Sequence, residues 1–138
     1  MEFNKLVPEL SVSDIECSKE FYLGVLNFKL EYERPEDKFA YLSYQGAQIM
    51  IEQINDNWNV GKLEYPFGRG INLQIETDEI ENISSRLKMR NYEIYKDIFK
   101  SSYEANGVVY DEYELLVQDP DGYLLRFQQT SQTEKWCW

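Results

Sequence analysis

The sequence repeats one order of secondary-structure elements, and this repeat constrains the fold more than any other feature. Apolar and alternating runs predict a strand, a helix and three further strands within residues 5–54, and the same order within residues 70–130. The segment 55–69 is polar and interrupted by glycine and proline, so we expect it to be a linker between half-units. Two such half-units in 138 residues predict a single α+β domain over residues 1–138.

Two landmarks recur at a fixed spacing. Asn27 and Asn91, which can adopt the left-handed conformation that ends a helix, lie 64 positions apart. Gly46 and Gly122, in the last hairpin of each half-unit, lie 76 positions apart. The second half-unit therefore carries about twelve additional residues, which we place near Ser101–Glu112.

The first strand and the first helix have local signals of their own. Residues 6–12 alternate between apolar and polar positions, which predicts a half-buried strand. Ser13 and Glu16 have the spacing of a capping box, so we expect Ser13 to cap the helix that follows.

The sequence contains no histidine, which removes the commonest general base and the commonest metal ligand together. Serine and cysteine triads that depend on histidine are thereby excluded. Cys17 and Cys137 do not have the spacing of zinc ligands, and we expect both to be reduced thiols.

The charge balance bears on partners and location. There are 25 acidic and 14 basic residues, a formal net charge of −11, and lysine and arginine form no cluster. We therefore expect neither nucleic acid nor a membrane as a partner. The sequence has no long apolar run and begins without the pattern of a signal peptide, so we expect a cytoplasmic protein.

Three motifs resemble the vicinal oxygen chelate superfamily, which includes glyoxalase I, fosfomycin-resistance enzymes, ring-cleaving dioxygenases and bleomycin-resistance proteins. The motifs are Val7–Ile15, Phe21–Phe28 and the segment Val117–Phe127 with its Asp-Pro-Asp-Gly turn. The resemblance covers nearly the whole chain. It implies two repeated β-α-β-β-β units that form a cupped mixed sheet.

The resemblance also locates the positions at which enzymes of the superfamily hold a divalent metal. These positions fall at Val7, Asn72, Arg126 and either Met50 or Glu52. One carboxylate among an apolar side chain, an amide and a guanidinium does not supply the ligands that zinc, iron or magnesium requires. We therefore expect no metal and no other cofactor.

Within the superfamily, the segments 64–72 and 116–123 are most similar to the bleomycin-resistance proteins. That resemblance implies a homodimer with two ligand clefts at the subunit interface, and sequestration of a drug without chemical change. We therefore expect a metal-free binding protein, not an enzyme, whose partner is a cationic aromatic molecule such as a bleomycin-type glycopeptide.

The candidate ligand-binding residues divide into aromatic and acidic groups. The resemblance places aromatic rings that could stack on a flat ligand at Tyr32, Phe39, Tyr110 and Tyr113. Trp58 lies in a polar segment and is a further candidate, whereas Glu31 and Glu52 could bind a cationic group. For each residue, ordinary packing or solvation is the alternative interpretation.

Two other functions remain open. A metal-independent enzyme of the same fold would use Glu9, Glu52 or Tyr113 for acid–base chemistry. A sensor of an endogenous small molecule would need no chemistry at all. We expect Arg126 to pair with Glu9, Glu52 or Glu76, and the tail Trp136–Trp138 either to dock on the surface or to fray.

Overall fold

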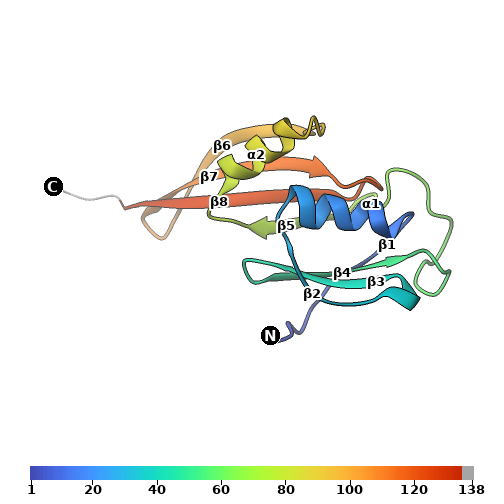
Figure 1. The fold of residues 1–138 in the computed structure, drawn as a ribbon. Helices are drawn as coiled ribbons and strands as arrows, with labels where there is room; N and C mark the ends of the chain where they lie inside the picture. The colour runs from blue at the N-terminus through green and yellow to red at the C-terminus, as the bar shows by residue number, and fades with distance from the viewer. Residues whose placement is uncertain (135–138) are drawn as a thin grey trace. The chain divides into compact units, whose positions relative to one another are not determined.

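The computed structural model describes residues 1–134, which form two compact units, each built around a four-stranded mixed sheet (Figure 1). Unit 1 contains β1 (Glu9–Val12), α1 (Ile15–Lys19), the π-helix η1 (Glu20–Val25), β2 (Lys29–Arg34), the 3-10 helix η2 (Pro35–Asp37), β3 (Phe39–Tyr44) and β4 (Ala47–Gln53). Unit 2 contains β5 (Asn72–Glu76), α2 (Ile80–Met89), β6 (Lys96–Ala105), β7 (Val108–Gln118) and β8 (Leu124–Glu134). The predicted repeat of a strand, a helix and three strands is confirmed.

The two sheets have the same topology. Their strand orders are β1-β4-β3-β2 and β5-β8-β7-β6, and in each the first strand pairs in parallel with the last, whereas the other pairs are antiparallel. The turn 119–123 between β7 and β8 belongs to unit 1 although its flanking strands belong to unit 2. The chain therefore returns to unit 1 for five residues.

One hydrogen bond occurs at equivalent places in both units. The Ile15 backbone N–H donates to Gln53 Oε1 at 3.2 Å, and the Ile80 backbone N–H donates to Gln129 Oε1 at 3.0 Å. The first N–H groups of a helix have no partner within the helix, so a glutamine from the last strand satisfies one of them in each unit. Ile15 and Ile80 lie 65 positions apart and the glutamines 76, compared with 64 and 76 for the sequence landmarks.

The start of α1 differs from the predicted capping box. Asp14, not Ser13, caps the helix, and its Oδ1 accepts hydrogen bonds from the backbone N–H groups of Glu16 (2.9 Å) and Cys17 (3.3 Å). Ser13 instead donates its backbone N–H to Asp121 Oδ2 at 3.0 Å. That long-range bond fixes Ser13 before the helix begins and leaves Asp14 in the capping position.

The structure also bears on the predicted helix ends, the first strand and the cysteines. Asn27 and Asn91 have φ values of 61° and 53°, the left-handed conformation expected at the helix ends. The first strand is shorter than predicted and begins at Glu9, after Pro8, which has no N–H to donate to a strand ladder. Cys17 is an exposed free thiol, whereas Cys137 and the tail 136–138 lie outside the described residues.

The additional residues of unit 2 form no separate loop. They lengthen the hairpin of β6 and β7, which turns at Asn106 and Gly107 with φ values of 53° and 78°. Two consecutive residues with positive φ make the type I′ geometry that matches the twist of paired strands, and Asn-Gly is its preferred sequence.

The sheet of unit 1 has two chemically different faces. Side chains alternate along β3, so Leu42 and Tyr44 lie on one face and Tyr41 on the other. Tyr44 stacks on Phe28, which contacts Tyr22 of η1, so the helical segment covers the Tyr44 face (Figure 1). The opposite face, which we call the polar face, carries aromatic and polar side chains.

The turn 119–123 is held by a buried carboxylate. Asp119 is 1% exposed, and its Oδ1 accepts the backbone N–H groups of Asp121 and Tyr123, both at 2.9 Å. Its Oδ2 accepts the Tyr22 hydroxyl at 2.8 Å. Burial raises the pKa of Asp119 to about 6, against the opposing effect of these hydrogen bonds.

None of the helices that the structure describes is long and apolar enough to cross a membrane.

The raised pKa of Asp119 predicts a pH dependence of stability. The folded state holds the Asp119 proton up to about pH 6, whereas an unfolded aspartate releases it near 3.8, so the free energy of unfolding should fall as pH rises between these values. The decrease should be about 3 kcal/mol at most. Asp119→Asn keeps an oxygen acceptor and cannot ionise, so denaturant titrations across this range should show a difference in the free energy of unfolding between the two proteins that changes with pH. Parallel profiles for the two proteins would contradict the prediction.

Candidate functional site

The candidate site lies on the polar face of unit 1, where β3 and β4 run side by side. Phe39 is paired with Glu52, and Tyr41 with Met50, so their side chains share this face. Tyr32 of β2 pairs with Tyr41 from the other side. The strands thereby place aromatic rings and a carboxylate next to each other.

Glu52 is a buried carboxylate on this face that neighbouring side chains fix by hydrogen bonds. Its side chain is largely buried, and Oε1 accepts hydrogen bonds from Asn55 Nδ2 at 2.7 Å and Trp58 Nε1 at 3.2 Å. Among the groups that the structure describes, no side chain or backbone N–H donates a hydrogen bond to Oε2 of Glu52. A buried carboxylate held by one oxygen keeps the other available to a ligand.

Glu52 and Trp58 line a pocket of about 530 Å³, which we call the acidic pocket. Its wall also contains Glu36, Asp37 and Lys38, so three carboxylates face one ammonium. The Trp58 side chain is 67% exposed and is oriented by the hydrogen bond from its indole to Glu52. A pocket of this composition favours a ligand with a positive charge and a flat apolar part.

A row of aromatic rings lies along the same face. Tyr32 stacks on Tyr41 with ring centroids 5.2 Å apart, and it lies 5.9 Å from Phe39. Phe39 and Tyr41 are buried, and the Arg34 guanidinium covers the Phe39 ring at 4.0 Å. Tyr32 is 38% exposed and is therefore the ring of this row with surface to offer a ligand.

Two further carboxylates of unit 1 have altered pKa values. The Ser43 hydroxyl donates to Glu31 at 2.6 Å and, with the Lys29 ammonium at 3.5 Å, holds the pKa of Glu31 below its ordinary value. Burial first, and the Glu52 carboxylate second, raise the pKa of Glu9, although Arg34 acts in the opposite direction. Glu31 is thus engaged within the sheet, whereas Glu9 and Glu52 repel each other.

The remaining predicted residues belong to unit 2. Tyr110 stacks on Tyr103 across the β6–β7 hairpin at 5.2 Å. Tyr113 lines a pocket of about 420 Å³ at the start of α2, with the Lys100 ammonium 5.9 Å from its ring. Glu52 and Trp58 both line the acidic pocket, and its lining contains neither of these two tyrosines.

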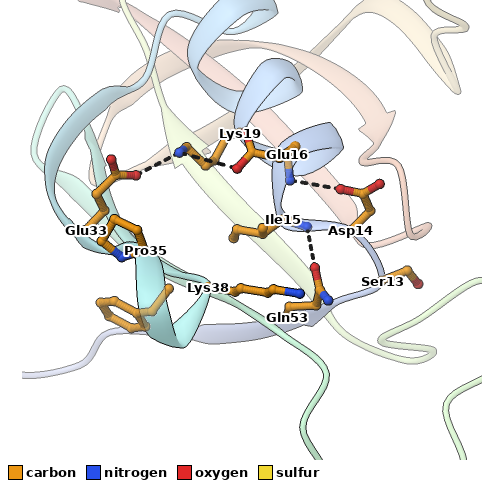
Figure 2. Close-up of a pocket in the computed structure, with 10 residues that line it drawn as sticks. Ser13, Asp14, Ile15, Glu16, Lys19, Glu33, Pro35, Lys38 and Gln53 are labelled. Carbon is orange, nitrogen blue, oxygen red and sulfur yellow. Dashed lines mark hydrogen bonds and ion pairs between the residues drawn. The ribbon is translucent and has the colours of Figure 1, made fainter.

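A second pocket of unit 1, of about 450 Å³, lies beside the start of α1 (Figure 2). Lys19 bridges Glu33 at 2.7 Å and Glu16 at 3.9 Å on one side of it. Lys38 and Gln53 line both this pocket and the acidic pocket. The two pockets therefore share these two side chains.

The sequence interpretation missed Tyr41, Gln48 and Asn55. Tyr41 lies two positions after Phe39, so strand alternation was a sufficient signal for its place on the polar face. Gln48 lies opposite Ser43 in the β3–β4 pair, and its exposure is low. No sequence signal indicated that Asn55 contacts Glu52.

Comparison with known proteins identifies the family. The sequence model of the Glyoxalase/Bleomycin resistance protein/Dioxygenase superfamily matches residues 4–127. The chain belongs to this superfamily. No curated protein sequence matches the chain.

Several solved structures are similar to this chain. A member from Vibrio splendidus 12B01 is 38% identical, with 89% of this chain and 96% of that chain covered and a TM-score of 0.41. A virulence protein from Salmonella typhimurium is 22% identical over 94% and 98% of the two chains, with a TM-score of 0.65. TioX from Micromonospora sp. ML1 is 16% identical over 92% and 98%, with a TM-score of 0.71. The last two share the fold.

The residues present do not fit the metal of the superfamily's enzymes. Arg126 occupies one ligand position, and its guanidinium donates to Glu114 at 3.2 Å and to Gln74 at 2.7 Å. The expectation that Arg126 pairs with Glu9, Glu52 or Glu76 is wrong, because β8 lies between β5 and β7 and those strands supply its partners. Over the described part of the chain, no group of three His, Cys, Asp or Glu side chains is placed to hold a metal ion.

The side chains at the superfamily's metal-ligand positions predict that the stability of this protein does not depend on a metal ion. Arg126 places a positive charge where a cation would bind, so neither zinc nor an excess of EDTA should shift the melting temperature of the purified protein. Elemental analysis after gel filtration checks the same point. One equivalent of a transition metal per chain, with a lower melting temperature after its removal, would contradict the prediction.

Proposed function

We propose that this superfamily member is a metal-free binding protein that sequesters a cationic, partly aromatic small molecule, of which the bleomycin-type glycopeptides are the class to test, and that it acts in the cytoplasm. The observation that carries the proposal is the geometry of the Glu52 carboxylate. It is largely buried, and its Oε1 accepts hydrogen bonds from the Asn55 amide and from the exposed indole of Trp58.

Charge supports a cationic ligand. The acidic pocket has three carboxylates and one ammonium, and the whole chain has a formal net charge of −11. One of the carboxylates, Asp37, forms an ion pair with Arg34 at 3.2 Å, so Glu36 and Glu52 remain to bind a positive group. An acidic protein also attracts cations over longer distances at low salt.

Exposed rings support an aromatic part of the ligand. Trp58 and Tyr32 both retain free surface, whereas the rings between strands are already covered. Stacking of a flat ligand on such a ring contributes about 0.5–1.5 kcal/mol beyond the area that it buries. Sequestration then depends on affinity and abundance, and it requires no general base.

A second candidate function, acid–base catalysis without a metal, has one specific observation in its favour. Burial first, and the Glu52 carboxylate second, raise the pKa of Glu9, so Glu9 keeps its proton to a higher pH than an isolated glutamate would. Sequestration is preferred because the Oε1 atom of Glu52 is engaged by Trp58 and Asn55, an arrangement that fixes a charge for binding.

We also propose that the protein forms a homodimer and that the ligand cleft lies at the interface. Unit 1 exposes several large apolar side chains, namely Leu6, Val60, Tyr65 and Ile71. Burial of such side chains against a second copy would remove apolar surface from water.

Sedimentation velocity should therefore give a species of twice 16.5 kDa at micromolar concentration. Replacement of the fully exposed Val60 by Asp puts a charge at one of these apolar positions and should shift the population toward the monomer. A single species of 16.5 kDa for the unsubstituted chain would exclude the interface cleft.

Isothermal calorimetry with a bleomycin-type glycopeptide tests the ligand. We expect about one ligand per chain and unchanged ligand by mass spectrometry. Glu52→Gln should weaken binding about ten-fold, since it removes the charge and keeps an oxygen for Trp58 and Asn55. Tyr32→Ala should weaken binding about five-fold.

Matched controls come from elsewhere in the chain. Glu93→Gln and Tyr103→Ala alter an exposed carboxylate and an exposed ring of unit 2, and they should leave the affinity unchanged. Equal affinity in the Glu52→Gln variant and the unsubstituted protein, or no binding at millimolar ligand, would refute the proposed function.

A further inference from the structure

We propose that the polar face carries a second site, the peptide subsite, in which Tyr32, Tyr41 and Gln48 bind an aromatic residue within an extended peptide, and that the chain's own residues 2–4 occupy this site. The inference goes beyond the proposed function, because it names a peptide as the ligand and rests on contacts outside the acidic pocket.

The side chain of Gln48 binds peptide main chain. Its Nε2 donates to the carbonyl oxygen of Glu2 at 2.7 Å, and its Oε1 accepts the backbone N–H of Asn4 at 2.8 Å. One amide group thus binds the carbonyl before Phe3 and the N–H after it, as a neighbouring strand would. Neither bond depends on the side chains of Glu2 or Asn4, so any extended peptide can make both.

Two tyrosines hold the ring that lies between these main-chain contacts. The Phe3 ring meets Tyr41 at 5.3 Å with an interplanar angle of 86°, and Tyr32 at 6.4 Å with an angle of 83°. Edge-to-face contact of this kind is a favoured arrangement of aromatic rings. The subsite therefore selects an aromatic side chain at the central position of the peptide.

The subsite is rigid before a ligand enters. The Tyr41 hydroxyl donates to Gln48 Oε1 at 2.6 Å, which fixes the amide with its oxygen as an acceptor and its nitrogen as a donor. Both side chains are buried and belong to neighbouring strands. An amide held in this way loses little conformational entropy on binding.

The segment that fills the subsite is held weakly. Phe3 remains 59% exposed, and residues 1–6 are exposed and precede β1. Besides the two bonds to Gln48, Asn4 Nδ2 donates to the carbonyl oxygen of Gly46 at 3.0 Å. Few buried contacts hold such a segment, so a peptide with the same pattern can displace it.

The two sites adjoin each other along the strands. Tyr41 pairs with Met50, and two residues further along Phe39 pairs with Glu52 of the acidic pocket. A single ligand with a peptide part and a cationic part could span both sites and contact Tyr32 in common. Gln48 and Tyr41 belong to the peptide subsite alone, and Glu52 and Trp58 to the acidic pocket alone, so variants of these residues test the two sites separately.

The test uses the tripeptide acetyl-Glu-Phe-Asn-amide, which has the sequence of residues 2–4, as the probe. Phe3→Ala removes the competing ring from an exposed position and leaves the subsite intact. We expect this variant to bind the tripeptide at least about ten-fold more tightly than the unsubstituted protein, because the fraction of molecules with an open site increases. Equal affinities, or no binding to either protein, would overturn the proposal.

Further variants separate the subsite from a general effect. In the Phe3→Ala background, Tyr32→Ala and Gln48→Met should each abolish the gain, and circular dichroism confirms that each variant is folded. Tyr65→Ala alters another exposed ring of unit 1 and should leave the gain unchanged. The probe acetyl-Glu-Ala-Asn-amide should not bind. Loss of the gain in Tyr65→Ala, or its retention in both subsite variants, would count against the subsite.

Two outcomes separate the peptide subsite from a dimer contact and from the acidic pocket. If Phe3→Ala dissociates a dimer and leaves tripeptide affinity unchanged, the segment serves contact with a second copy and the peptide subsite is refuted. If the protein binds the tripeptide but no glycopeptide, the inference stands and the proposed function fails, whereas the reverse result refutes the inference alone.

Discussion

The buried carboxylate of Asp119 links parts of unit 1 that lie far apart in the sequence. Asp119 accepts two backbone N–H groups of its own turn and the hydroxyl of Tyr22, which lies 97 positions earlier in the chain. The Tyr123 hydroxyl of the same turn donates to the Ser11 carbonyl of β1. The turn between β7 and β8 thus anchors η1 and β1, and the helical segment in turn covers one face of the sheet that carries the candidate site.

That coverage decides which face of the sheet is available for binding. The helical segment packs on the apolar face of β3 and β4, where side chains such as Leu42 and Ile51 are fully buried. The segment α1–η1 does not cover the polar face. There the Glu52 carboxylate accepts the indole N–H of Trp58, the Gln48 amide bonds to the backbone of Glu2 and Asn4, and the Phe3 ring contacts Tyr41. The proposed binding sites therefore lie on the face of this sheet that α1 and η1 leave uncovered.

Regular patterns in the sequence predicted the fold well, and the site less well. The repeat of elements and the helix ends at Asn27 and Asn91 follow from local periodicity and backbone preference, which a sequence displays directly. The sequence predicted Ser13 as the helix cap, whereas the structure has Asp14. The two residues have similar capping ability, and the choice depends on the hydrogen bond from the Ser13 backbone N–H to Asp121, which lies far along the chain.

The partners of Arg126 and the contacts of Gln48 depend likewise on which strands become neighbours, so no local pattern could reveal them. Glu52 and Trp58 could be nominated separately, whereas their hydrogen bond required the fold of segment 54–58.

The long hairpin of unit 2 affects how strongly the protein tends to aggregate at high concentration. Strand β6 is ten residues long and forms the outer edge of its sheet, where alternate residues direct their backbone groups away from β7 and toward no other described strand of the unit. An edge of that length invites another chain to pair with it, but Lys96, Lys100 and Glu104 place charge along it at every fourth position. Under the proposed sequestration, each ligand occupies one protein molecule, so the protein would have to accumulate. A charged edge would then oppose the strand-to-strand aggregation that high concentration promotes.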